Sequence, residues 1–307
     1  MKYTELELII LFLVVLSDHC KLMSYKLKTP FKTKILVDKN KSVIHSYKNK
    51  NKKALIFLTG GSQLEFSYYI KKLVDDLIFY QNIHQEYDIF VFENTHEINF
   101  LCISYISNWI KEYICPEYPN IIICGLSNGG CIGSKVVTNI IQNDEIKSKF
   151  KLITIDTIFD MADFLKTIEK NIFFRIDIFI AYAFVLCNSI KHTHLKSNIS
   201  FMDFFNVKDY KSFLISIEKM YGINQKSFEE TSKINFNIDE KCDIINIYSI
   251  NDPITDTKIN EKYYKKQQLQ NKVQSNIKNI PFDIVSHNTQ MVTEKLPKNF
   301  VNYSQNV

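Results

Sequence analysis

The chain has 307 residues, of which 46% are hydrophobic and 13% aromatic, and its formal net charge is +5 at pH 7. This composition excludes a disordered chain and suffices for one large domain, or for one domain with an insertion. The lysines are scattered, and the only dense basic run, residues 48–53, is typical of a solvated loop between two strands. We therefore expect no nucleic-acid partner.

The N-terminal stretch contains an unbroken apolar run of nine residues, from Leu8 to Leu16. Its length matches the apolar region of a signal peptide and is short for a membrane span. Val15 and Ser17 suit the small-residue positions before a cleavage site, although two glutamates precede the run where positive charge is expected. We expect residues 1–17 to be a signal peptide or short anchor, which directs the protein to the secretory pathway or a membrane. The alternative is a buried segment of a cytoplasmic protein. A chain that begins near Asp18 or stays membrane-bound would support the signal or anchor, and a full-length, soluble cytosolic product would refute it.

Apolar strands and helices alternate through the first half of the sequence. We expect strands at residues 31–38, 41–48, 54–58, 87–93, 120–124 and 151–159, and helices at about 64–80, 100–114 and 129–143. The strands at 54–58 and 120–124 are almost entirely apolar, which is typical of parallel strands that helices cover on both faces. The sequence therefore predicts an α/β fold with a mostly parallel sheet and helices on both faces.

The alternation stops over residues 160–240, which read as mostly helical, aromatic and irregular. It resumes after residue 240 with strands at 243–249 and 281–286, a polar helix at 256–272 and a short C-terminal helix. We therefore expect one α/β unit that residues 160–240 interrupt as an insertion.

The seven cysteines occur at no spacing typical of metal ligands or of a disulfide framework. Cys124 and Cys131 stand beside a glycine-rich stretch and are most simply small buried hydrophobic residues. His192 and His194 could supply two metal ligands, but no spacing places a third or fourth. We expect neither a metal nor a cofactor.

Four of the seven glycines lie in the stretch IIICGLSNGGCIG at residues 121–133. Its centre reads Gly-x-Ser-x-Gly around Ser127, directly after an expected strand and directly before an expected helix. A serine on such a sharp turn is held in strained backbone geometry, and the close approach of strand and helix explains Gly125 and Gly129. The helix N-terminus also brings free N–H groups and a positive dipole to the serine oxygen. This context favours a nucleophilic serine over a glycine-rich turn that serves packing alone.

A second glycine pair, Gly60 and Gly61, follows the strand expected at residues 54–58. An acyl-transfer serine needs backbone donors for the oxyanion of its tetrahedral intermediate. One natural donor is the N–H of Asn128, the residue after the serine, and we expect the other from Gly61 or Ser62. The alternative is a tight turn between strand and helix without a chemical role.

These motifs resemble those of the α/β-hydrolases. The stretch GLSNGG resembles the nucleophile elbow of that family, and LTGG resembles its oxyanion loop, although the histidine often found before these glycines is absent and Thr59 stands near its place. The resemblance covers about residues 31–307 apart from the insertion. It implies an α/β-hydrolase core formed by residues 24–159 and 241–307, with a helical cap or lid at 160–240.

In the α/β-hydrolases the triad residues follow one another along the chain as serine, acid and histidine. The carboxylate just past the strand expected at residues 243–249 is Asp252. Asp256 is the second candidate, although it suits the N-cap of the next helix better. His287 is the only histidine downstream of Asp252, and it follows the last expected strand. The resemblance therefore implies a triad of Ser127, Asp252 and His287.

The resemblance further implies a serine hydrolase that cleaves carboxylic esters through an acyl-enzyme. The aromatic and apolar stretch at residues 171–187 is either the core of a helical cap or an apolar acyl-binding lid. The expected partner is therefore a small-molecule ester or lipid, with peripheral membrane contact through the cap or the N-terminus. A peptidase or thioesterase on the same fold, and a non-catalytic α/β-hydrolase-like binding protein, stay open as alternatives.

Overall fold

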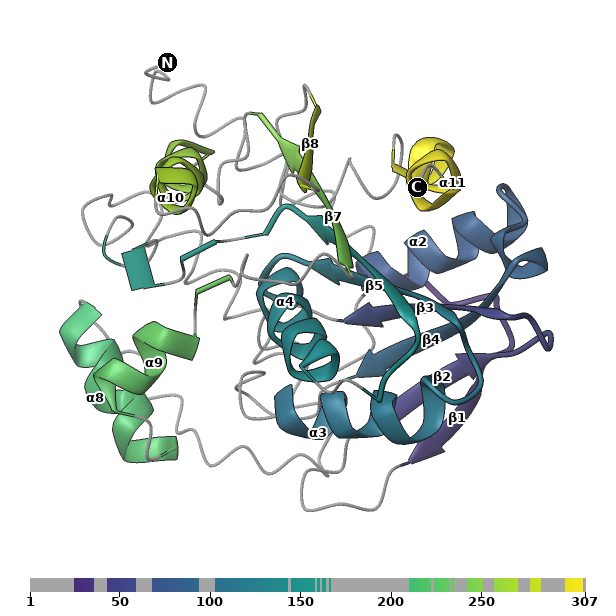
Figure 1. Cartoon of the computed structure of the whole chain (residues 1–307), viewed down its shortest axis with the longest axis horizontal. Coiled ribbons are helices and arrows are strands. Elements are labelled where there is room, and N and C mark those ends of the chain that lie inside the picture. Colours follow the sequence, from purple (N-terminus) through teal and green to yellow (C-terminus); the bar gives the residue numbers. More distant parts are fainter. Residues whose placement is uncertain are drawn as a thin grey trace.

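The computed structural model of the chain consists of a sheet between two layers of helices (Figure 1). The structure describes residues 25–35, 43–58, 68–93, 103–142, 145–157, 159–160, 162–163, 166, 210–221, 224–231, 233–234, 242–250, 257–269, 277–282 and 296–305. The expected N-terminal signal at residues 1–17 and the stretch at 171–187 lie outside these ranges. The boundaries of the expected insertion therefore stay predictions, whereas the expected fold class is confirmed.

Within the described ranges, eight strands form one sheet in the order β1-β2-β4-β3-β5-β6-β7-β8. They are β1 (Lys32–Ile35), β2 (Val43–Tyr47), β3 (Lys53–Leu58), β4 (Tyr87–Glu93), β5 (Asn120–Leu126), β6 (Lys149–Ile155), β7 (Cys242–Ser249) and β8 (Ile277–Phe282). β2 runs antiparallel to both β1 and β4, and all pairs from β4 to β8 along the sheet are parallel. Because parallel strands end at the same edge, the carboxyl ends of β3, β5, β6, β7 and β8 share one edge of the sheet.

Helices cover both faces of the sheet. The helices are α2 (Tyr68–Phe79), α3 (Ile103–Trp109), α4 (Asn128–Ile141), α8 (Tyr210–Tyr221), α9 (Gln225–Thr231), α10 (Thr257–Leu269) and α11 (Leu296–Gln305). α3 and α4 pack on one face, and α2 and α11 pack on the other (Figure 1). α3 continues into a short π-helix, Ile110–Ile114. Among the described residues, no helix is both long and apolar enough to cross a bilayer.

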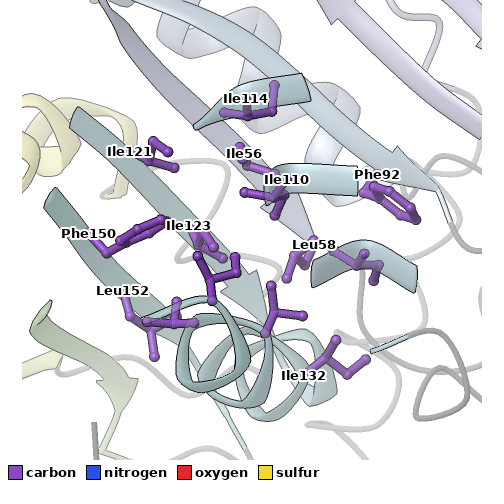
Figure 2. Packing of buried hydrophobic residues seen from close by; sticks show 14 of the residues in the cluster. Ile56, Leu58, Phe92, Ile110, Ile114, Ile121, Ile123, Ile132, Phe150 and Leu152 are labelled. Carbon is purple, nitrogen blue, oxygen red and sulfur yellow. The ribbon is translucent and has the colours of Figure 1, made fainter. Parts of the chain in front are cut away.

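The two faces of the sheet each carry a hydrophobic core. Along β3, Ile56 and Leu58 face α3 and α4, whereas Leu55 and Phe57 face α2 and α11. Figure 2 shows the first of these cores, with Ile56 and Leu58 beside side chains of β5, β6 and the neighbouring helices. Successive side chains of a strand point to opposite faces, so a strand covered on both faces is mostly apolar along its length.

A row of hydrogen-bonded polar side chains crosses β6, β7 and β8, buried at Thr154 and Asn246 and exposed at Asn279 on the edge strand. The hydroxyl of Thr154 donates a hydrogen bond to Oδ1 of Asn246 (2.8 Å), and Nδ2 of Asn246 donates to Oδ1 of Asn279 (3.0 Å). The three residues are directly opposite one another in the strand register. A shift of one strand by one residue would leave the buried groups unpaired, so the row fixes where the three strands end.

Most strand and helix predictions are confirmed to within a few residues, but two strand ends are wrong. β6 ends at Ile155 and not at residue 159. β8 begins at Ile277 and not at residue 281; its described part ends at Phe282, and residues 283–286 of the expected strand lie outside the described ranges. β8 is an edge strand that pairs only with β7, so it carries polar residues on its open sides. An edge strand also tolerates Pro281, which has no N–H to donate.

The carboxylate of Asp75 holds the segment before β1 against α2. It accepts hydrogen bonds from the hydroxyl of Tyr25 (2.8 Å), from the N–H groups of Lys28 (2.8 Å) and Thr29 (2.9 Å), and from the hydroxyl of Thr29. Burial and the bond to Asp75 raise the pKa of Tyr25 above its usual value. One buried side chain therefore fastens residues 25–29 to the helix layer.

Replacing Asp75 tests this anchor. Asp75→Ala leaves the buried donors of the segment unpaired, so we expect the free energy of unfolding to fall by about 2–4 kcal/mol. Tyr25→Phe removes one of the four bonds and should cost only about 1 kcal/mol. Urea unfolding of both variants measures the difference, and equal stabilities of Asp75→Ala and the wild type would contradict the assignment.

Candidate active site

Ser127 forms the turn between β5 and α4, with φ 50° and ψ −124°. Residues other than glycine rarely adopt a positive φ, so the surroundings must hold this conformation in place. The N–H of Ser127 donates to the carbonyl of Ile155 at the end of β6 (2.8 Å), and its own carbonyl accepts from the N–H of Gly130 (3.1 Å). The turn thus presents a half-buried serine at the carboxyl end of a central strand.

Contact between β5 and α4 makes this turn sharp. A Cβ atom on Gly125 would lie 2.5 Å from the backbone nitrogen of Gly130 and still closer to the carbonyl of Gly129. A Cβ atom on Gly130 would lie 2.8 Å from Cγ2 of Thr157 and closer still to its hydroxyl oxygen. Real Cβ atoms do not approach other atoms this closely, so both positions require glycine.

Two features of the surroundings favour Ser127 as the nucleophile: a helix N-terminus lies beside its hydroxyl oxygen, and the neighbouring thiols are unreactive. α4 begins at Asn128, so unpaired N–H groups and the positive end of the helix dipole lie beside the serine. Burial raises the pKa of Cys124, and it raises that of Cys131 to about 12. Both thiols therefore stay protonated near neutral pH and do not compete as nucleophiles.

The other predicted site residues lie outside the described part of the chain, namely Gly61, Ser62, Asp252 and His287, together with the second acid candidate Asp256. Of Asn128 the structure describes the backbone, which begins α4. The strands that precede these site residues in the sequence are described: β3, β7 and β8 end at the same edge of the sheet as β5. The chain therefore leaves that edge toward each of these residues, and the triad and the oxyanion donors stay predictions.

No metal ligand cluster was predicted from the sequence. Among the residues that the structure describes, no three His, Cys, Asp or Glu side chains come together as metal ligands would. His192 and His194 lie outside these residues.

Two buried polar residues, Asp156 and Thr157, lie at the end of β6, inside the stretch that the sequence predicts as continuous strand. Asp156 is fully buried and has φ 44°. Its carboxylate accepts hydrogen bonds from the N–H (2.7 Å) and the hydroxyl (3.2 Å) of Ser249 at the end of β7. The Thr157 hydroxyl is buried and has no hydrogen-bond partner within the described ranges. The change from apolar residues to the pair Asp-Thr is the sequence signal that marks this strand end.

α10 fastens the two ends of the expected insertion to the core. Asn260 donates to the carbonyl of Thr157 (2.9 Å) and accepts from the N–H of Phe159 (3.1 Å). The carbonyl of Phe159 accepts in turn from the N–H of Ile234 (2.8 Å), whose own carbonyl accepts from the hydroxyl of Tyr263 (2.9 Å). The chain therefore leaves β6 and returns toward β7 at neighbouring points.

Alanine at two glycines tests the contact between β5 and α4. Gly125→Ala places a methyl group against backbone atoms that cannot move separately, so we expect a loss of about 3 kcal/mol or more in the free energy of unfolding. Gly133→Ala, on α4, is the matched control. Its methyl group would meet the side-chain ends of Leu152 and Ile123 at 3.0 and 3.4 Å. Alanine also favours the helix, so the control should stay within about 1 kcal/mol of the wild type. Equal urea midpoints for the two variants would contradict the described contact.

Comparison with known proteins gives matches among solved structures only. No protein-family model and no curated protein sequence matches the chain. Esterase B from Lactobacillus rhamnosis, solved with a C4-C4 tributyrin phosphonate inhibitor, is 8% identical with a TM-score of 0.56, over 99% of this chain and 96% of that chain. The Pyrococcus furiosus esterase Pf2001 is 12% identical with a TM-score of 0.56, over 92% of this chain and 94% of that chain.

A third match is carboxyl esterase 2 from the mycorrhizal fungus Tuber melanosporum, which is 14% identical with a TM-score of 0.54, over 92% of this chain and 86% of that chain. At such identities the likeness concerns the fold alone. It agrees with the mostly parallel sheet and the helices that cover both of its faces. The chain therefore has the α/β-hydrolase fold.

Proposed function

We propose that this protein is a serine hydrolase that cleaves a carboxylic ester with an apolar, lipid-like acyl group, through Ser127, Asp252 and His287. The observation that carries the proposal is the backbone conformation of Ser127, which is held at φ 50° between β5 and the N-terminus of α4. Its neighbours at 125 and 130 must be glycine, yet residue 127 itself is not.

A serine in this conformation needs an explanation. Strained backbone of this kind costs on the order of 1–3 kcal/mol, and glycine would adopt it with little strain. A turn that served packing alone would therefore be more stable with glycine at position 127. The hydroxyl group is what serine adds, and it stands where a helix N-terminus favours negative charge. The strain is thus best explained by a nucleophilic role.

The proposed reaction has two halves. The hydroxyl oxygen of Ser127 attacks the ester carbonyl while its proton passes to His287, and the N–H of Asn128 together with that of Gly61 or Ser62 stabilises the oxyanion. The bond to the alcohol oxygen then breaks, and the alcohol leaves with the proton from His287. Water attacks the acyl-enzyme and gives its proton to His287; the bond between the acyl carbon and the oxygen of Ser127 then breaks, His287 returns the proton to that oxygen, and the carboxylic acid leaves. Asp252 orients the imidazole and stabilises its charged form.

Two considerations support an ester with an apolar acyl group. The structural neighbours above are named esterases, and one of them was solved with a tributyrin phosphonate. The insertion at residues 160–240 is rich in apolar and aromatic residues, notably in the stretch 171–187. We propose that this segment covers the site and contacts the acyl chain. Together with the apolar run at the N-terminus, it would support peripheral membrane contact and a secretory or membrane-associated location.

Labelling with a fluorophosphonate, combined with hydrolysis of p-nitrophenyl esters, tests the proposed nucleophile. Ser127→Ala should abolish labelling and lower kcat by about 10⁵–10⁶-fold, and His287→Ala should lower it to a similar degree because the two residues act as a unit. Asp252→Asn should cost about 10⁴-fold.

The control for the nucleophile is Ser134→Ala, a serine within α4 whose hydroxyl donates to the carbonyl of Cys131 (2.7 Å). It should keep wild-type labelling. Full labelling of Ser127→Ala would overturn the proposal. An active Asp252→Asn beside an inactive Asp256→Asn would move the acid to Asp256.

A series of esters from acetate to decanoate tests the proposed substrate class. An apolar wall discriminates by about 0.8 kcal/mol per methylene, which is about four-fold in kcat/KM. Replacing Phe179 and Phe184 by alanine should flatten the preference for long chains and spare acetate, because the triad lies outside the insertion. An equal loss on acetate and decanoate would show that these residues support the fold and do not select the acyl chain.

A further inference from the structure

We propose that Asp156 is a positioning residue of the active site: its carboxylate fixes the end of β7, where the chain departs toward Asp252, relative to the Ser127 turn. The inference rests on the proposed function and adds a residue to it that the family resemblance does not supply. It depends on the contacts of four described residues at the carboxyl edge of the sheet.

Asp156 joins β6 to β7 at the point where both strands end. Its N–H donates to the carbonyl of Ile247 (2.9 Å), so the two strands stay paired up to this residue. Its backbone then turns to φ 44°, and its side chain reaches Ser249, the last residue of β7. The carboxylate accepts both the N–H and the hydroxyl of Ser249, at 2.7 and 3.2 Å.

The burial of this pair explains why the residue is an aspartate. Asp156 and Ser249 are both fully buried, so the N–H and the hydroxyl of Ser249 cannot turn to water instead. A carboxylate can accept both hydrogen bonds at once, whereas an apolar side chain would leave two buried donors unpaired. The contact therefore defines a single position for the end of β7.

The next residue of the chain is fixed as well. The N–H of Ile250 donates to the carbonyl of Phe282 at the end of β8 (2.8 Å). Asp252 follows two residues later in the sequence. Consecutive Cα atoms are about 3.8 Å apart, so a displacement of Ser249 is passed to Asp252 through a very short stretch of chain.

The same end of β6 also holds the nucleophile. Ile155 accepts the N–H of Ser127 at 2.8 Å, and the following residue, Asp156, binds Ser249. Two consecutive residues thus connect the serine turn with the strand that leads to the proposed acid. A misplacement of about 1 Å between catalytic groups can cost about 10²-fold in rate, which gives this link a measurable consequence.

Two substitutions of Asp156 separate positioning from direct catalysis. Asp156→Asn keeps an oxygen for the N–H of Ser249 and offers an amide to its hydroxyl, so kcat should stay within about 10-fold of the wild type. Asp156→Ala removes both contacts and should lower kcat by about 10²-fold with KM nearly unchanged. Ser249→Ala removes only the hydroxyl contact and should lie between the two.

A double-mutant cycle tests whether Asp156 acts through Asp252. Once Asp252→Asn has removed the acid, its exact placement no longer matters, so adding Asp156→Ala should lower kcat little further. The assay uses the full chain, p-nitrophenyl acetate and thermal unfolding of each variant. If Asp156→Ala does not fold, Asp156→Asn and Ser249→Ala replace it, and kcat of each is measured alone and combined with Asp252→Asn.

Four results would overturn the inference. An Asp156→Asn variant as inactive as Asp252→Asn would make Asp156 the acid itself. A lower melting temperature with unchanged kcat, or losses that simply multiply in the double variant, would leave it a structural residue only. An inert wild-type chain, unlabelled by fluorophosphonate, would overturn the proposed function and this inference together. If the wild type is active, any of the first three results overturns the inference alone.

Discussion

The contact of α4 with β5 is the constraint on which the rest of the site depends. Gly125 allows the backbone at Gly129 and Gly130 to approach within contact distance, and the chain must therefore reverse within the single residue Ser127. The hydrogen bond from Ser127 to Ile155 then ties the reversal to β6. A looser packing of helix on sheet would permit a longer loop, and the serine would lose both its fixed position and the helix dipole.

The sheet carries this local constraint across the molecule. The polar row of Thr154, Asn246 and Asn279, of which the first two are buried, sets the register of β6, β7 and β8, and the strands consequently end side by side. Just beyond that row, Asp156 joins β6 to Ser249, and the carbonyl of Phe282 accepts the N–H of Ile250. Polar contacts inside an apolar sheet are costly unless every partner is satisfied, which makes them suitable for specifying one alignment.

The sequence predicts the serine turn well because the requirement is local. Glycines at positions 125 and 129 around Ser127, between an apolar strand and a helix, leave few other conformations. The end of β6 is harder to predict, since Asp156 leaves the strand only because its carboxylate binds Ser249, which lies 93 residues away in the sequence. β8 is missed in part because an edge strand shows no apolar run. The assignment of Asp252 as the acid and His287 as the base rests on their order along the chain. This order does not show which carboxylate contacts the histidine.

The anchoring of residues 25–29 by Asp75 has a consequence for how far the protein could lie from a membrane. Only the eight residues 17–24 separate the apolar run ending at Leu16 from Tyr25. Fully extended, this connection reaches at most about 30 Å. If the anchor is not cleaved, this short linker would keep the folded domain within about one domain diameter of the bilayer. The enzyme would then meet the proposed lipid-like ester at the high effective concentration of a tethered system. Cleavage of the linker would change the rate at which enzyme and substrate meet without altering the catalytic groups.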